Sequence, residues 1–297
     1  MRKLPGSLAG TSGRSDPPDS VRGLLARVLE LAEEAEWAQL ATLLPQALGE
    51  HPGEPYVLCW LGTAERELGM EAVAYERFKQ VLELSPRDPA VLATAGSAVA
   101  AFDDPTAEGA LRTAALLGPD LAHARLMYGS YLAREGMIEE GLRELDLAAE
   151  LAPDDPLVHM EFGVALTFAG DLEAAEVSFG RATELDPEDG WAWILGGLAH
   201  MELGNPNEVA TALEHRARLR PDDVVGQLLA ALALTAVGSA ERGLEMLERA
   251  RTHAGPVDAG VVSEVEDRIH EGPEDARELL TEALGPSSFR ERLRERP

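Results

Sequence analysis

The sequence has little of several residue types, and each shortage excludes a class of protein. Among 297 residues there is one cysteine, Cys59, so neither an intrachain disulfide nor a thiolate metal cluster can form. Aromatic residues make up only 5% of the chain, whereas 45% of its residues are hydrophobic. That composition favours helices over a β-sandwich or barrel, which needs more β-branched and aromatic residues. No run approaches the ~18 apolar residues of a membrane span.

Positive charge is also scarce. The chain has 26 basic residues against 53 acidic ones, a formal net charge of −27, and only two of the basic residues are lysines. A nucleic-acid-binding protein needs Lys and Arg for phosphate contacts, so this balance argues against one. An acidic surface would instead attract basic protein segments, or it would simply keep an Ala- and Leu-rich chain in solution.

The two ends differ in composition from the rest of the chain. Residues 1–20 are dominated by Gly, Ser, Asp and Pro and lack the continuous apolar stretch of a signal peptide. They predict a disordered leader, and the chain is expected to be cytoplasmic. Residues 286–297 form an Arg-rich tail with four arginines and two glutamates. It is expected to start a short helix at Ser288, with Phe289 and Leu293 facing inward.

Two independent sequence markers recur with one period in the middle of the chain. A proline that follows an apolar and acidic run is found at Pro86, Pro119, Pro153, Pro187 and Pro221, at separations of 33, 34, 34 and 34 residues. A small residue keeps the same period at Gly62, Gly96, Gly129, Gly163, Gly197 and Ala231. A fixed period of this length indicates a repeat protein in which each unit is one supersecondary element.

The unit at residues 156–189 predicts a pair of antiparallel helices. Asp155 can cap the first helix and Pro156 suits its first position, because a missing N–H costs nothing there. Gly163 would let a partner helix approach closely. Gly170 can adopt the left-handed conformation that ends a helix, and Asp171 can cap the second one.

This unit resembles the tetratricopeptide repeat family. The family's sequence of large, small, turn and packing residues is matched by Phe162, Gly163, Gly170, Ala175, Phe179, Ala182 and Pro187. The resemblance implies an all-α, right-handed superhelical solenoid of antiparallel helix hairpins, with six good repeats and two degenerate terminal ones. The predicted units lie near 21–54, 55–88, 89–121, 122–155, 156–189, 190–223, 224–257 and 258–285, and together they form a solenoid over 21–285.

Catalytic and metal-binding patterns are missing from the sequence. There is no phosphate-binding loop, no HExxH pair and no GxSxG elbow, and no two histidines lie four residues apart. Paired acids such as Asp154 and Asp155 suit calcium, but their position before a helix favours capping. Cys59 is expected to pack in the core rather than react. We therefore expect a non-enzymatic protein without cofactor or metal.

The resemblance also implies a binding surface, because in this family the first helix of each repeat lines a concave face. Helical spacing places an apolar stripe on that face in the C-terminal repeats. We call its predicted partner-binding residues the groove stripe: Met160, Val164, Phe168, Trp191, Ile194, Leu198, Met201 and Leu228. They predict a scaffold or adaptor that accepts a peptide or helix of a partner protein, with basic segments in that partner favoured.

Two alternatives remain open from the sequence. The groove stripe could be buried between neighbouring repeats or against the Arg-rich tail. The chain could also be a structural subunit that self-associates or assembles permanently with an enzyme. The family's carboxylate clamp is not expected, because the corresponding positions hold residues such as Ser97, Ser130 and Val164, and only Arg66 and Arg134 supply cations there.

Overall fold

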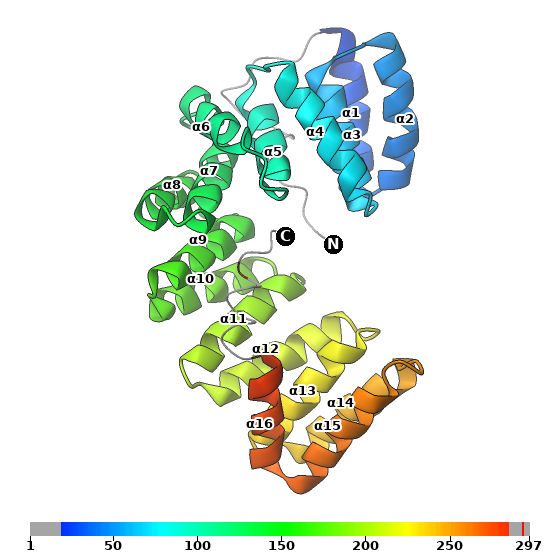
Figure 1. Ribbon diagram of the computed structural model, residues 1–297, viewed down its shortest axis with the longest axis vertical. Coiled ribbons are helices and arrows are strands. Elements are labelled where there is room, and N and C mark those ends of the chain that lie inside the picture. The colour runs from blue at the N-terminus through cyan, green and yellow to red at the C-terminus, as the bar shows by residue number, and fades with distance from the viewer. Residues whose placement is uncertain (1–18, 285–292, 294–297) are drawn as a thin grey trace. The chain divides into compact units, whose positions relative to one another are not determined.

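The computed structural model describes residues 19–284 and residue 293, and over that part of the chain it contains sixteen α-helices and no strand (Figure 1). The fold is an all-α solenoid of helical hairpins. The chain divides between Pro153 and Asp154 into two compact units. A leader is predicted at residues 1–20, and residues 1–18 of it lie outside the described residues. The first helix begins at Asp19, two residues before the predicted start of the solenoid.

The N-terminal unit contains four consecutive helical hairpins. Its helices are α1 (Asp19–Glu33), α2 (Trp37–Glu50), α3 (Pro55–Glu67), α4 (Glu71–Glu83), α5 (Pro89–Ala100), α6 (Ala107–Leu117), α7 (Ala122–Arg134) and α8 (Ile138–Leu151). Most of their packing is between the two helices of a hairpin, and α2, α4 and α6 also pack against the first helix of the next hairpin. Leu40, Phe78 and Leu145 are among the largest side chains that this arrangement buries fully.

The C-terminal unit contains another four hairpins. Its helices are α9 (Pro156–Ala169), α10 (Leu172–Leu185), α11 (Gly190–Glu202), α12 (Pro206–Leu219), α13 (Val224–Ala236), α14 (Ala240–His253), α15 (Ala259–Glu271) and α16 (Pro273–Leu284). One continuous hydrophobic cluster runs through all eight helices of this unit.

Short-range signals in the sequence fix where the α9–α10 hairpin begins and turns. The Asp155 carboxylate accepts a hydrogen bond of 3.0 Å from the Leu157 N–H, as predicted for the first cap. Gly170 has φ of +83°, a left-handed conformation that glycine adopts without steric cost. Asp171 then caps α10 by accepting from the Ala174 N–H at 3.1 Å. All three features confirm the local predictions for this unit.

The close approach predicted at Gly163 is also present. A methyl group added to Gly163 would lie 2.7 Å from the ring of Phe179, whose side chain is fully buried on α10. Only glycine therefore lets α9 and α10 pack at this distance. Gly62 and Phe78 form the equivalent contact in the α3–α4 hairpin, where an added methyl group would lie 3.0 Å from the ring.

The last hairpin packs differently from the others. Its two helices are joined by Gly272 alone, with φ of +136°, and α16 packs against α13 while α15 contacts both α13 and α14. The Arg277 guanidinium donates a 3.0 Å hydrogen bond to the Ala236 carbonyl at the C-terminal end of α13. Because the last carbonyls of a helix have no partner within it, this contact satisfies one and complements the helix dipole.

Cys59 lies on α3 in the core of the N-terminal unit and has no exposed surface. Burial raises the pKa of its thiol to about 12, and the neighbouring Arg66 opposes this rise only in part. The thiol therefore stays protonated at neutral pH, where it is a poor nucleophile. This agrees with the prediction that Cys59 packs rather than reacts.

Candidate functional site

The structure gathers all eight residues of the groove stripe in the hydrophobic cluster of the C-terminal unit. The stripe comes from the first helices of three consecutive hairpins, α9, α11 and α13. Five of its residues are buried, with exposed fractions between 2% and 8%: Met160, Val164, Ile194, Leu198 and Leu228. For these five, the alternative that the stripe is buried describes the structure better than an open apolar patch.

The other three residues of the groove stripe are half-buried and lie against this apolar floor. They are Phe168 near the end of α9 and Trp191 and Met201 near the two ends of α11. Each combines a large apolar side chain with partial access to solvent, as expected of anchors that bind a partner. We call these three residues the rim.

The two tryptophans of α11 have different roles. Trp193 stacks on His215 of α12, with ring centroids 4.1 Å apart, and its Nε1–H donates a 3.0 Å hydrogen bond to the Pro187 carbonyl. These contacts give Trp193 a packing role between α11 and α12. Trp191, by contrast, has no side-chain hydrogen bond or ring contact of this kind among the described residues and packs only against the cluster that contains the groove stripe.

Helix α13, which carries Leu228, is held by polar contacts around its first turn. Asp223 caps the helix by accepting from the Gly226 N–H at 3.0 Å, and it pairs with Arg216 of α12. Although burial opposes its ionisation, the Gly226 N–H and the Arg216 guanidinium lower the pKa of Asp223. Gln227 has no exposed surface and donates to the Ala217 carbonyl at 2.6 Å. These contacts link α13 to α12.

A buried carboxylate joins two hairpins of the same unit. Glu214 on α12 is 5% exposed and receives hydrogen bonds from Arg218, at 2.7 Å, and from Arg242 of α14. Burying an unpaired carboxylate costs free energy, and the two arginines offset that cost for Glu214. The contact with Arg242 links the α11–α12 hairpin to the α13–α14 hairpin. Glu214 therefore has a structural role.

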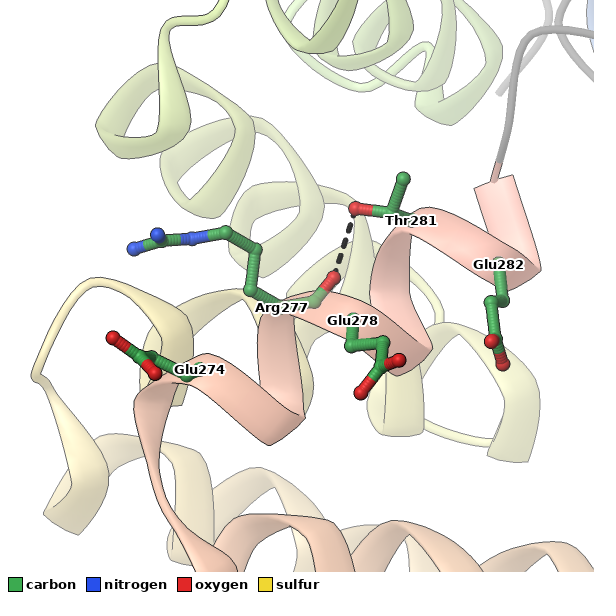
Figure 2. Close-up of a pocket in the computed structure, with 5 residues that line it drawn as sticks. All are labelled: Glu274, Arg277, Glu278, Thr281 and Glu282. Atoms are coloured by element: carbon green, nitrogen blue, oxygen red, sulfur yellow. Dashed lines mark hydrogen bonds between the residues drawn. The ribbon is translucent and has the colours of Figure 1, made fainter.

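The outer face of α16 is acidic. Glu274, Glu278 and Glu282 follow one another at four-residue spacing, and with Arg277 and Thr281 they line a shallow surface depression (Figure 2). The Thr281 hydroxyl donates to the Arg277 carbonyl at 2.8 Å, so it is engaged within the helix (Figure 2). Residues 154–284 as a whole contain 27 acidic and 9 basic residues. The field around the C-terminal unit therefore favours positively charged ligands.

The equivalent helices of the N-terminal unit present small and polar residues instead. Thr63, His123 and Ser130 are nearly closed to solvent, and Thr94 hydrogen-bonds to His123 at 3.3 Å. Arg134, one of two cations expected near this surface, hydrogen-bonds to the Ser130 carbonyl at 3.4 Å. At these positions the described N-terminal helices have fewer large apolar side chains than the C-terminal stripe, and Leu126 is one of the few.

No cluster of three His, Cys, Asp or Glu residues that could hold a metal ion occurs between residues 19 and 284 or at residue 293. None of the described helices is long and apolar enough to cross a membrane.

One segment of the chain matches a known repeat family. Residues 158–189 match the family model described as tetratricopeptide repeat. This match covers most of α9 and all of α10, and it includes the close approach of Gly163 to Phe179 and the Asp171 cap. The chain therefore contains a segment that matches one tetratricopeptide repeat. A comparison with curated proteins gives no match to the sequence.

Solved structures with the same fold extend this relationship beyond one repeat. A chain in the crystal structure of the APC/C hetero-tetramer Cut9–Hcn1 is similar over 82% of this chain and 48% of its own length, with TM-score 0.63 and 20% identity. The present chain thus spans about half the length of that protein. A tetratricopeptide repeat protein from Parabacteroides merdae is similar over 88% of this chain and 100% of its own, with TM-score 0.53 and 14% identity.

A third structure, TTC0263 from Thermus thermophilus, is described as a thermophilic TPR protein. It is similar over 61% of this chain and 98% of its own, with TM-score 0.51 and 21% identity. Identities this low establish the shared fold alone. Because a fold does not determine a function, any ligand must be argued from the residues of this chain.

Proposed function

We propose that this protein is a non-catalytic cytoplasmic adaptor whose C-terminal unit binds a helix or extended segment of a partner protein along the groove stripe. The observation that carries the proposal is the rim. Phe168, Trp191 and Met201 are half-buried large apolar side chains on a closely packed apolar floor. Residues that are partly exposed and seated on a rigid support lose little conformational entropy on binding, which favours affinity.

The acidic surroundings of the C-terminal unit support a partner segment with Lys or Arg. Charge complementarity of this kind raises the association rate and disfavours acidic competitors. The apolar contacts mainly lower the dissociation rate. We therefore propose a segment with one or two large apolar anchors flanked by basic residues. The buried floor residues would act by supporting the rim rather than by direct contact.

A displayed peptide library tests this proposal without knowledge of the natural partner. The full chain is used for selection, and enriched peptides are assayed on two triple variants. The rim variant is Phe168→Ala/Trp191→Ala/Met201→Ala. The control is Val177→Ala/Leu244→Ala/Val261→Ala, which removes three exposed apolar side chains from α10, α14 and α15.

Enriched peptides should be basic, should bind the control variant like the wild type, and should bind the rim variant at least tenfold more weakly. Truncation of a few well-packed anchors typically dominates the loss of binding energy, whereas exposed side chains elsewhere contribute little. Peptides that bind the rim variant and the wild type equally would overturn the proposal. Circular dichroism spectra of both variants check that each remains folded.

A further inference from the structure

One residue of the Arg-rich tail lies in the core of the C-terminal unit. Leu293 is 1% exposed and belongs to the same hydrophobic cluster as the groove stripe. Its sequence neighbours are Arg292 and Arg294, and α16 ends nine residues earlier at Leu284. Leu293 is therefore an apolar contact between the Arg-rich tail and this cluster.

The start of the tail follows a helix, α16, that packs against α13, and α13 carries one residue of the groove stripe. The hydrogen bond from Arg277 to the Ala236 carbonyl fixes the first half of α16 at the C-terminal end of α13. Leu284, seven residues on and ~10 Å further along the helix, is buried in the same cluster. Helix α13 carries Leu228 of the stripe and contains no charged residue. Nine further residues reach up to ~30 Å, and adjacent packed helices lie only ~10 Å apart.

Charge complements this geometry. The tail from residue 285 has four arginines and two glutamates, whereas residues 154–284 have three times as many acidic as basic residues. Phe289 lies four positions before Leu293, so in a helical conformation both apolar side chains would share one face. The tail therefore has the chemistry proposed above for a partner segment, namely apolar anchors flanked by arginines.

We propose that residues 285–297 occupy the groove stripe of their own chain, with Leu293 as the anchor, and compete there with the partner. This inference rests on the proposed function, and it deepens that function in two ways. It makes the adaptor self-inhibited, so that a partner must displace the tail. It also defines the recognised ligand as a basic amphipathic segment with an aliphatic or aromatic anchor. A competitor held in the same chain acts at high effective concentration and lowers the apparent affinity for ligands in solution.

Photo-crosslinking in the full chain tests where the tail lies. Phe289 is replaced by benzoylphenylalanine, which keeps an aromatic side chain, and the irradiated protein is digested and analysed by mass spectrometry. We expect crosslinks within one chain to peptides of α9, α11 or α13, in a yield independent of protein concentration. Crosslinks confined to α15 and α16, crosslinks only between two copies, or no crosslink would each overturn the proposal.

A peptide-binding assay tests whether the tail competes with ligands in solution. A labelled synthetic peptide of residues 285–297 is titrated into the wild type, the Leu293→Asp variant and the control Leu244→Asp, which alters an exposed leucine on α14. We expect the peptide to bind Leu293→Asp at least tenfold more tightly than the wild type or the control. Equal binding to all three, or no binding to any, would contradict self-inhibition. Crosslinking in the chain with native Leu293 remains informative if the Asp variant unfolds.

The two proposals can fail separately. Library-selected peptides that depend on the rim but bind the wild type and Leu293→Asp equally would leave the proposed function intact and reject the tail as a competitor. Selected peptides that ignore the rim would reject the proposed function, whatever the crosslinks show.

Discussion

Replacing Phe179 with Ala is expected to lower the free energy of unfolding of the C-terminal unit by about 3–5 kcal/mol. The Phe179 ring has no exposed surface and fills the contact between α10 and the backbone of α9 at Gly163. Removing the ring forfeits the free energy gained by transferring it from water to the core. It also leaves a cavity that the packed helices cannot fully close. Because α9 carries Met160 and Val164, the same substitution should also disorder the floor of the groove stripe.

Urea unfolding followed by circular dichroism measures the total loss of stability. Since repeat arrays can unfold in stages, amide hydrogen exchange of residues 156–185 should assign the loss to this hairpin. Val177→Ala on the same helix is the matched control, because Val177 is 67% exposed and its truncation should change stability by less than about 0.5 kcal/mol. A loss below about 1 kcal/mol for Phe179→Ala would contradict the packing described for α9 and α10.

Substitution of Gly163 with Ala should cost about 1–3 kcal/mol, because the added methyl group meets the Phe179 ring at 2.7 Å. Gly180→Ala on α10 is the matched control. Nothing lies within 4 Å of an added methyl group at Gly180, so the better helix propensity of Ala should raise stability by up to about 1 kcal/mol.

A double-mutant cycle separates steric conflict from backbone effects at Gly163. In the Phe179→Ala background the ring is gone, so Gly163→Ala should become neutral or stabilising. The same cost in both backgrounds would mean that the requirement for glycine comes from the backbone rather than from the close approach.

Features that depend on neighbouring residues in the sequence were predictable. The caps by Asp155 and Asp171 and the left-handed Gly170 follow from residue chemistry over a few positions, and the structure confirms them. The repeat period also placed the groove stripe on three successive first helices.

The exposure of the groove stripe was not predictable, because it depends on which helices lie beside each residue. Helical spacing assigns Met160 and Phe168 to one face, yet Met160 is buried and Phe168 is half-buried. The docking of α16 against α13 likewise depends on long-range contacts such as that of Arg277. Glu214 could be paired with Arg218 from i,i+4 spacing, whereas its pairing with Arg242, 28 residues away, requires the folded structure.

The burial of Leu293 is the feature with the largest functional consequence. Its inward orientation was expected from the spacing of Phe289 and Leu293, but the cluster that it joins is defined only by the fold. Phe289 itself and the rest of the tail lie outside the described residues. Two mechanisms could attract a basic segment to the C-terminal unit: binding of its apolar anchors by the groove stripe, or attraction to the acidic surface alone.

Fluorescence anisotropy of a library-selected peptide at low and high salt distinguishes these two possibilities most directly. Dissociation constants are compared for the wild type, the rim variant and the control variant Val177→Ala/Leu244→Ala/Val261→Ala. We predict that the rim variant binds at least tenfold more weakly at both salt concentrations and that the control binds like the wild type. Binding that is lost in high salt for all three proteins, and that is unaffected by the rim substitutions in low salt, would show that surface charge performs the recognition and would contradict the groove stripe as the binding site.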